Sequence, residues 1–241
     1  MTRRRWIADE VSGNQARLTG DHADHLTRVL RARVGQEFDI VADGKVRRGK
    51  ITEITDAQVD LALGEDLPPT TIPKITLVLA IFKFDRMEWA IEKCTELGVS
   101  GIIPVIAART DAHLAATAGK RAERWRRIAR QAAEQSRREA PPEIAEPIKL
   151  KDALTIPGKI RIVLSESEQQ QSIPDVLSVN DDVVLAIGPE GGWTPAEFDL
   201  LQSKGWTAAT LGQTILRAET AAIAATAIAM SLLADQEANE E

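Results

Sequence analysis

The chain has 241 residues, 44% of them hydrophobic and 27% charged, which is typical of a globular protein with a buried core. Its formal net charge is −6, but residues 73–150 carry 14 Lys and Arg against 10 Asp and Glu, whereas residues 151–241 carry 5 against 14. A single cysteine, Cys94, excludes an intrachain disulfide, and no apolar stretch suits a signal peptide or a membrane span, so we expect a cytoplasmic protein.

The first 70 residues predict a small β-rich module. Strands are expected at residues 37–41, 46–54 and 58–63. The pair Asp43-Gly44 predicts a tight turn between the first two strands, and residues 24–33 are expected to form a short helix. Three prolines within residues 67–73 predict a stiff linker, which places a domain boundary between residues 72 and 73.

After the linker, apolar runs alternate with amphipathic segments. Strands are expected at residues 75–81, 102–106, 160–164 and 183–187. Helices are expected at residues 86–97, 120–138, 195–204 and 218–234. This alternation predicts a parallel α/β sheet, so residues 73–241 are expected to form a second domain.

The expected helix at residues 120–138 is strongly basic. Residues 120–138 hold eight basic and two acidic side chains. A local basic face can bind phosphates even in an acidic chain, although on charge alone a solvated helix face is the simpler explanation.

A glycine-rich turn, Gly188-Pro189-Glu190-Gly191-Gly192, follows the expected strand that ends at Ile187. Glycines let a ligand approach the backbone closely, and ligands of open α/β sheets bind at the carboxyl ends of the strands. A tight turn without a ligand explains the glycines equally well. The spacing matches neither a P-loop nor the dinucleotide-binding fingerprint.

A second segment turns through Gly212 and enters an alanine-rich helix. Arg217 and Glu219 lie near the start of this helix, where polar groups can face a ligand. A helix that is apolar on every face must be buried, either in the core of the chain or in a subunit interface. The pattern does not separate these two alternatives.

Other polar residues give weaker signals. Lys83 and Arg86 follow the first buried strand, so they are expected at the carboxyl edge of the sheet, where cations can meet a phosphate or a substrate oxygen. The histidines do not cluster with Cys94 at metal-ligand spacing, and we expect no metal site. No serine lies in a nucleophile elbow, which disfavours a hydrolase.

Together, five segments of the chain resemble the RsmE family of 16S ribosomal RNA uracil-N3-methyltransferases, in the SPOUT superfamily. Each segment alone is weakly diagnostic, but their order and spacing are specific. These segments contain His25 to Arg31, Lys83 to Val99, Trp125 to Arg138, Gly188 to Gly192 and Leu211 to Ala221.

The resemblance implies a PUA-like RNA-binding β-barrel domain at residues 1–72 and a SPOUT methyltransferase domain with a deep trefoil knot at residues 73–241. It implies S-adenosylmethionine as the cofactor, 16S ribosomal RNA of the small ribosomal subunit as the partner, and a homodimer with sites near the interface. One departure from the family pattern is Thr110 after Arg109, where a serine is expected.

The resemblance also implies site residues. The cofactor pocket is expected to involve Leu164, Glu166, Ile187, Gly188, Pro189, Glu190, Gly191, Gly192, Leu211, Gly212, Ile215, Leu216, Arg217 and Thr220. RNA is expected to contact Arg3, Arg4, Arg5, Arg28, Arg31, Lys83, Arg86, Arg138 and the basic helix.

The implied reaction assigns roles to a few of these residues. Arg217 and Arg86 are candidates to stabilise the oxygens of an anionic uracil, and Glu219 is a candidate to orient an arginine. Two alternatives remain at this point: a related enzyme that methylates a ribose 2′-oxygen or another base, and a non-catalytic RNA-binding protein with a vestigial pocket.

Overall fold

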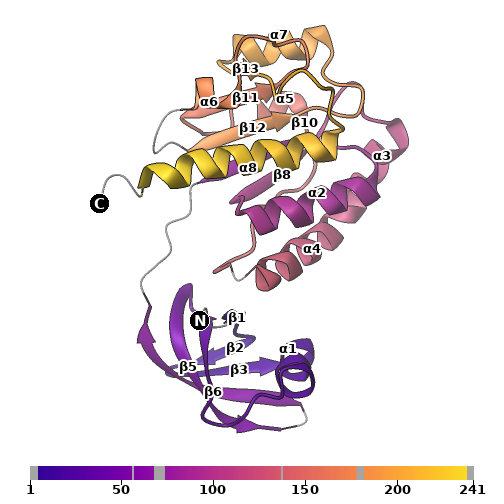
Figure 1. Ribbon diagram of the computed structural model, residues 1–241. Coiled ribbons are helices and arrows are strands. Elements are labelled where there is room, and N and C mark those ends of the chain that lie inside the picture. Colours follow the sequence, from indigo (N-terminus) through magenta and orange to yellow (C-terminus); the bar gives the residue numbers. More distant parts are fainter. Residues whose placement is uncertain (1–4, 56, 68–73, 137, 178–181, 238–241) are drawn as a thin grey trace. The chain divides into compact units, whose positions relative to one another are not determined.

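The computed structural model describes residues 5–55, 57–67, 74–136, 138–177 and 182–237, with side chains up to residue 233. The chain forms two compact units (Figure 1). The first contains residues 1–71 and 133–140, and the second contains residues 72–132 and 141–241. The last residues of the segment expected as a basic helix therefore group with the N-terminal unit. The predicted boundary between residues 72 and 73 lies outside the described residues.

The first unit is built on a six-stranded sheet. Its strands, in spatial order, are β1 (Arg5–Ile7), β4 (Glu37–Ala42), β5 (Lys45–Ile54), β6 (Gln58–Asp66), β3 (Gln15–Thr19) and β2 (Glu10–Ser12). All neighbours are antiparallel except β1 and β4. Asp43 and Gly44 have φ of 50° and 74°, so the predicted tight turn between β4 and β5 is confirmed. Strands β1 to β3 were not predicted, because three to five residues are too few for an alternating pattern.

The helix expected at residues 24–33 is wrong in extent. The chain is helical from Gly20 to Asp24 in α1 and continues as the π-helix η1 (His25–Val29). Helical geometry ends before Arg31, whose φ of 50° lies in the left-handed region. Because Arg31 is not a glycine, the sequence gives no sign of this backbone reversal, which explains the error.

The second unit contains a parallel sheet in the spatial order β10-β8-β7-β12-β11-β13, with β9 also pairing with β8. The predicted strands are confirmed as β7 (Ile75–Ala80), β8 (Gly101–Ile106), β11 (Ile160–Leu164) and β12 (Val183–Ile187). Three short strands were missed: β9 (Glu143–Ile144), β10 (Ile148–Lys149) and β13 (Thr207–Ala209). Because β13 extends the sheet beyond β11, the ends of β12, β11 and β13 lie side by side.

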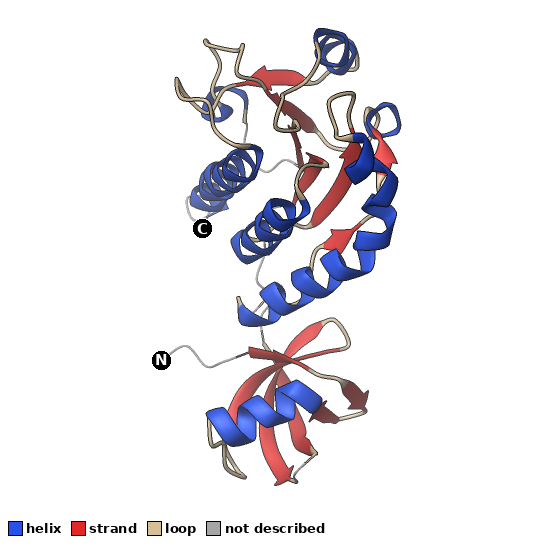
Figure 2. Cartoon of the chain, turned by 90° about the vertical axis from the view of Figure 1, so that its right-hand side faces the viewer, coloured by secondary structure: helices blue, strands red, loops and turns tan. Residues whose placement is uncertain are grey.

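Helices cover both faces of this sheet (Figure 2). One core cluster contains side chains of α2 (Phe84–Leu97), α4 (Ala122–Gln135), α6 (Ile173–Val176) and α8 (Ala218–Glu237). The other contains side chains of α5 (Leu150–Ala153) and α7 (Pro195–Ser203). Two further helical segments are α3 (Ala112–Thr117) and the 3₁₀ helix η2 (Ala118–Arg121). Alternate side chains along each strand belong to the two clusters. The predicted burial of the sheet on both faces is therefore confirmed.

Helices α2 and α8 pack side by side. Thr226 on α8 lies 3.6 Å (Oγ1 to Sγ) from Cys94 on α2, and Glu219 lies close to Arg86 near the start of both helices. The two helices therefore run in the same direction, with both N-termini at the carboxyl edge of the sheet. Burial raises the pKa of the Cys94 thiol to about 12, which makes it a packing residue rather than a nucleophile.

Candidate functional site

A cavity of about 440 Å³ lies at the carboxyl ends of three neighbouring strands. The turns after β11, β12 and β13 all contribute to its wall. Its lining includes apolar side chains such as Leu164, Ile187 and Leu211, and acidic ones at Glu166, Glu190 and Asp199. A cavity at the carboxyl edge of a parallel sheet is the usual ligand site of this architecture.

The glycine-rich turn forms one wall of the cavity, and its backbone conformation is fixed by local contacts. Gly192 has φ of 69°, and its N–H donates to the carbonyl of Pro189 at 2.8 Å. A Cβ atom at Gly188 would lie 3.3 Å from the Trp193 ring, so a side chain there would press against the indole. Thr194 and Glu197 then form a capping box at the start of α7 (Pro195–Ser203).

The loop after β8 holds this turn from the other side. The Arg109 guanidinium donates from Nη1 to the carbonyls of Gly191 and Trp193, and the Ala108 N–H donates to Glu197 Oε1 at 2.7 Å. The Thr110 hydroxyl donates to the Ile81 carbonyl at 3.3 Å and accepts from the Ala107 N–H at 3.1 Å. A serine hydroxyl could form the same two hydrogen bonds. Thr110, which stands where the family pattern has a serine, therefore makes the contacts expected of that position.

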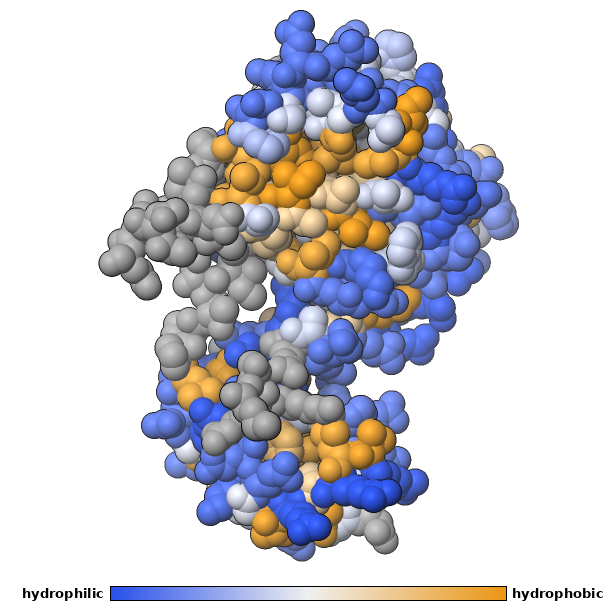
Figure 3. All heavy atoms as spheres, in the orientation of Figure 1, coloured by the Kyte–Doolittle hydropathy of each residue, from blue (hydrophilic) through white to orange (hydrophobic). Residues whose placement is uncertain are grey.

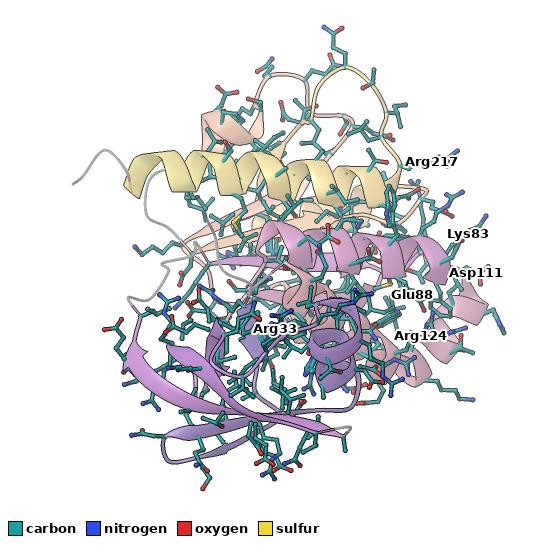
Figure 4. All side chains as sticks on the ribbon, turned by 60° about the horizontal axis from the view of Figure 1, so that its bottom comes forward. Arg33, Lys83, Glu88, Asp111, Arg124 and Arg217 are labelled. Atoms are coloured by element: carbon teal, nitrogen blue, oxygen red, sulfur yellow. The ribbon has the colours of Figure 1, made fainter. Side chains whose placement is uncertain are left out.

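The segment before α8 closes the cavity. Gly212 has φ of 113°, a conformation that favours glycine. Ile215 is 81% exposed at the cavity rim, and Arg217 is exposed immediately before α8. Figure 4 shows Arg217 and Lys83 on the same side of the unit, near the starts of α8 and α2.

Arg86 connects α2 to two acidic residues of the site. Its Nη1 lies 2.9 Å from Oε1 of Glu190, and its Nε lies 3.7 Å from Oε1 of Glu219. The Glu219 side chain is only 5% exposed, and its Oε2 has no hydrogen-bond partner within the described part of the chain. Arg86 therefore supplies the nearest positive charge to a buried carboxylate.

Eleven of the fourteen residues expected in the cofactor pocket line this cavity: Leu164, Glu166, Ile187, Gly188, Pro189, Glu190, Gly192, Leu211, Gly212, Ile215 and Leu216. The other three, Gly191, Arg217 and Thr220, are sequence neighbours of lining residues but do not line the cavity themselves. Sequence reasoning missed Arg109, Trp193 and Phe198 as lining residues. Arg109 carried a signal, because it follows a buried strand of the same sheet, whereas the two aromatic side chains look like ordinary core residues.

The residues expected to contact RNA are found in several environments. Arg3 and Arg4 lie outside the described residues. Arg5 forms an ion pair with Glu139 at 3.7 Å, and Arg28 forms one with Asp24 at 3.3 Å, in both cases within the first unit. Arg31 and Lys83 are exposed. Arg138 is partly buried, which lowers its pKa.

The basic helix is partly neutralised by acidic neighbours. Arg124 on α4 donates to both oxygens of Glu88 on α2, at 2.7 and 2.8 Å (Figure 4). Arg126 pairs with Glu123 and, at 2.7 Å, with Glu146. The number of basic residues in this segment therefore overstates the charge that it offers to a phosphate.

Two further observations bear on the class of site. Within residues 5–237, apart from the gaps given above, no group of three or more His, Cys, Asp or Glu is placed to hold a metal ion. Over the same residues, no helix combines the length and hydrophobicity that crossing a membrane requires.

Comparison with known protein families gives two matches. A model described as an RNA methyltransferase domain matches residues 69–230, and one described as an RNA methyltransferase PUA domain matches residues 18–63. Together with the parallel sheet and its cavity, these matches define an RNA methyltransferase with an N-terminal PUA-like domain.

The relatives narrow this class. The ribosomal RNA small subunit methyltransferase E of Rickettsia conorii is 34% identical over 90% of this chain and 90% of its own length, and that of Aquifex aeolicus is 30% identical over 94% and 98%. The enzyme of this name from Neisseria gonorrhoeae, solved bound to S-adenosyl methionine, is 29% identical with a TM-score of 0.81 and covers 96% of this chain and 98% of its own.

The chain belongs to the ribosomal RNA small subunit methyltransferase E family. The family resemblance of the sequence and the expected fold class, a PUA-like domain followed by a parallel-sheet α/β methyltransferase domain, are thereby confirmed. The trefoil knot stays a prediction.

Proposed function

We propose that this chain transfers a methyl group from S-adenosylmethionine to N3 of a specific uridine in 16S ribosomal RNA, in the cytoplasm. The observation that carries the proposal is the meeting of three strand-end turns around one cavity of about 440 Å³ in a chain of this family. The Neisseria gonorrhoeae relative, which shares the fold along almost its whole length, was solved with that cofactor bound.

The cavity suits this cofactor in size and charge. Ligand pockets usually measure roughly 300–1,000 Å³, and this cavity lies in the lower part of that range. S-adenosylmethionine carries a sulfonium, an ammonium and a carboxylate. Glu166, Glu190 and Asp199 can face the two cations. The apolar side chains Leu164, Ile187 and Leu211 offer surfaces for the adenine ring.

The cofactor supplies an electrophilic methyl group, so the protein mainly aligns the target nitrogen and excludes water. The proton on uracil N3 must pass to a base or to water, and the ring carries negative charge on its oxygens until N3 takes the methyl group. Arg86 and Arg217 are proposed to stabilise that charge. Glu219 is proposed to orient Arg86, because it is the buried carboxylate beside the Arg86 guanidinium.

The partner is proposed to be the RNA of the small ribosomal subunit. Uracil N3 lies on the base-pairing edge, so the target base must be unpaired or flipped out of its stack. Exposed cations at Arg28, Arg31 and Lys83 are proposed to contact phosphates, with Arg28 reaching RNA at the expense of its ion pair with Asp24.

We further propose that the chain acts as a homodimer through α8. Apolar side chains gather over this helix on the surface of the unit (Figure 3). Ile223, Ala227, Ile228 and Met230 are only partly buried, although the helix is apolar almost all round. An apolar face of this kind is typical of a subunit interface. Light scattering on purified protein tests the proposal, and a monomer at micromolar concentration would contradict it.

The experiment for the activity measures transfer of labelled methyl groups to small ribosomal subunits from a strain that lacks the family enzyme. We expect label on one uridine at N3, located by mass spectrometry of nuclease fragments, and strongly reduced transfer by Arg217→Ala. Label on a ribose oxygen or another base would support the alternative of a related enzyme that methylates a ribose 2′-oxygen or another base. Calorimetry without S-adenosylmethionine binding would support the non-catalytic RNA-binding protein.

A further inference from the structure

Arg109 contributes the positive charge of the cavity lining. Among the described residues that line it, Arg109 is the one cationic side chain, whereas three lining residues are acidic. Nη1 of Arg109 is engaged with the carbonyls of Gly191 and Trp193. Within the described part of the chain, its Nε and Nη2 donate no hydrogen bond. A guanidinium has five N–H groups, so donors remain for a ligand.

The backbone that carries Arg109 is fixed on both sides. The Ala108 N–H donates to Glu197 Oε1, and the Thr110 hydroxyl bridges the Ile81 carbonyl and the Ala107 N–H. Asp111 then caps α3 by accepting from the N–H groups of His113 and Leu114. With this backbone fixed and Nη1 bound to the carbonyls of Gly191 and Trp193, the guanidinium is held at the cavity wall before any ligand arrives. Binding a ligand then costs less side-chain entropy than it would for a free arginine.

The charges of the cavity complement those of one ligand class. An adenosyl amino acid presents a carboxylate at the end of its chain, opposite in charge to its ammonium. A carboxylate placed among Glu166, Glu190 and Asp199 would be repelled, whereas Arg109 offers a charge-assisted hydrogen bond. The two carbonyls that hold Nη1 also fix the plane of the guanidinium.

We propose that Arg109 is the subsite for the carboxylate of the amino-acid part of the cofactor. The proposal rests on the proposed function of the cavity, and it adds a residue that the family resemblance did not assign. Arg109 has two roles in it: Nη1 fixes the glycine-rich turn, and the remaining donors bind the carboxylate.

The test compares two ligands that differ only in that carboxylate. Calorimetry on the full chain measures the affinities of S-adenosylhomocysteine and of its decarboxylated analogue, for the wild type, Arg109→Ala and Arg109→Lys. Lys151→Ala is the matched control, because Lys151 is an exposed cation of the same unit that does not line the cavity. The affinity ratio of the two ligands isolates the carboxylate contact, since a looser turn would weaken both ligands alike.

We expect the wild type and Lys151→Ala to bind S-adenosylhomocysteine about tenfold more tightly than the analogue, as one charged hydrogen bond predicts. Arg109→Ala should reduce this ratio to about one, and Arg109→Lys should give an intermediate ratio. A ratio that Arg109→Ala leaves unchanged, or a wild-type ratio near one, overturns the subsite while the proposed function stands. A wild type that binds neither ligand overturns the proposed function and the subsite together.

Discussion

Arg86 on α2 and Glu190 in the glycine-rich turn form an ion pair with 2.9 Å between Nη1 and Oε1. The two residues are 104 positions apart in the sequence. Their contact joins the end of β7 to the end of β12, two strands that are direct neighbours in the sheet. Because Arg86 also approaches the buried Glu219, one guanidinium connects a wall of the cavity to the start of α8.

Replacing Arg86 by methionine should destabilise the second unit. The variant leaves the Glu219 carboxylate buried without its cation, and we expect the free energy of unfolding to fall by about 2 kcal/mol, below the range for a fully buried pair because Arg86 is partly exposed. Urea unfolding measures this loss. Adding Glu219→Gln should recover part of it.

Arg124→Met is the matched control for this change. Arg124 also forms an ion pair with a residue of α2, but its side chain is 47% exposed. We expect a much smaller fall in the free energy of unfolding than for Arg86→Met, because an exposed ion pair contributes little to stability. Equal costs for Arg86→Met and Arg124→Met would show that burial of Glu219 does not govern the effect.

The sequence predicted the long elements of the second unit well, because buried strands such as β11 and β12 are continuous apolar runs with clear ends. It missed β13, whose three residues, Thr207 to Ala209, have no periodicity of their own. It also missed Arg109 as a lining residue, since the contact of its guanidinium with the turn at Gly191 depends on the sheet order. The glycine-rich turn and the segment before α8 could be recognised in the sequence, because each contains a glycine that adopts a positive φ, Gly192 and Gly212.

Gly212→Ala tests the backbone of the segment before α8. An added Cβ atom would meet no atom within 4 Å, so its effect comes from φ of 113° alone. We expect this conformation to cost the folded state about 1–2 kcal/mol of stability. We also expect a lower affinity for S-adenosylhomocysteine, which calorimetry measures.

Gly119→Ala is the control, because Gly119 also has open space around its Cβ position but no positive φ. This variant should bind the ligand as the wild type does. Unchanged binding by Gly212→Ala would mean that the segment rearranges at no cost to the cavity.

Lys83→Ala should weaken RNA binding without changing its sequence preference. Lys83 is exposed at the N-terminus of α2, where its ammonium can neutralise one phosphate (Figure 4). Fluorescence anisotropy with a 16S ribosomal RNA fragment gives the slope of the logarithm of affinity against the logarithm of salt concentration. We expect this slope to become shallower by about 0.7–0.9. Lys151→Ala should keep the wild-type slope, and a wild-type slope for Lys83→Ala would remove this residue from the RNA contact.

His22 should make the stability of the first unit depend on pH. Its Nε2 lies 3.1 Å from Oε2 of Glu134 and its Nδ1 lies 3.0 Å from Oδ2 of Asp9. The hydrogen bond to Glu134 is the main cause that raises the pKa of His22 from 6.5 to about 9, with Asp9 adding to it and burial opposing it. The Trp6 ring also contacts the His22 imidazole edge-on, and it contacts His25 in the same way.

Because the pKa is raised in the folded state, the charged imidazole stabilises the fold fully below pH 6.5. This stabilisation is lost as the pH rises from 6.5 to about 9, and a shift of this size corresponds to at most about 3 kcal/mol. Urea unfolding of the wild type and of His22→Gln across this range measures it. The difference between the two proteins cancels the titration of shared groups, so it should shrink steadily with rising pH. A difference that stays constant from pH 6 to pH 9.5 would show that His22 does not hold its proton between Asp9 and Glu134.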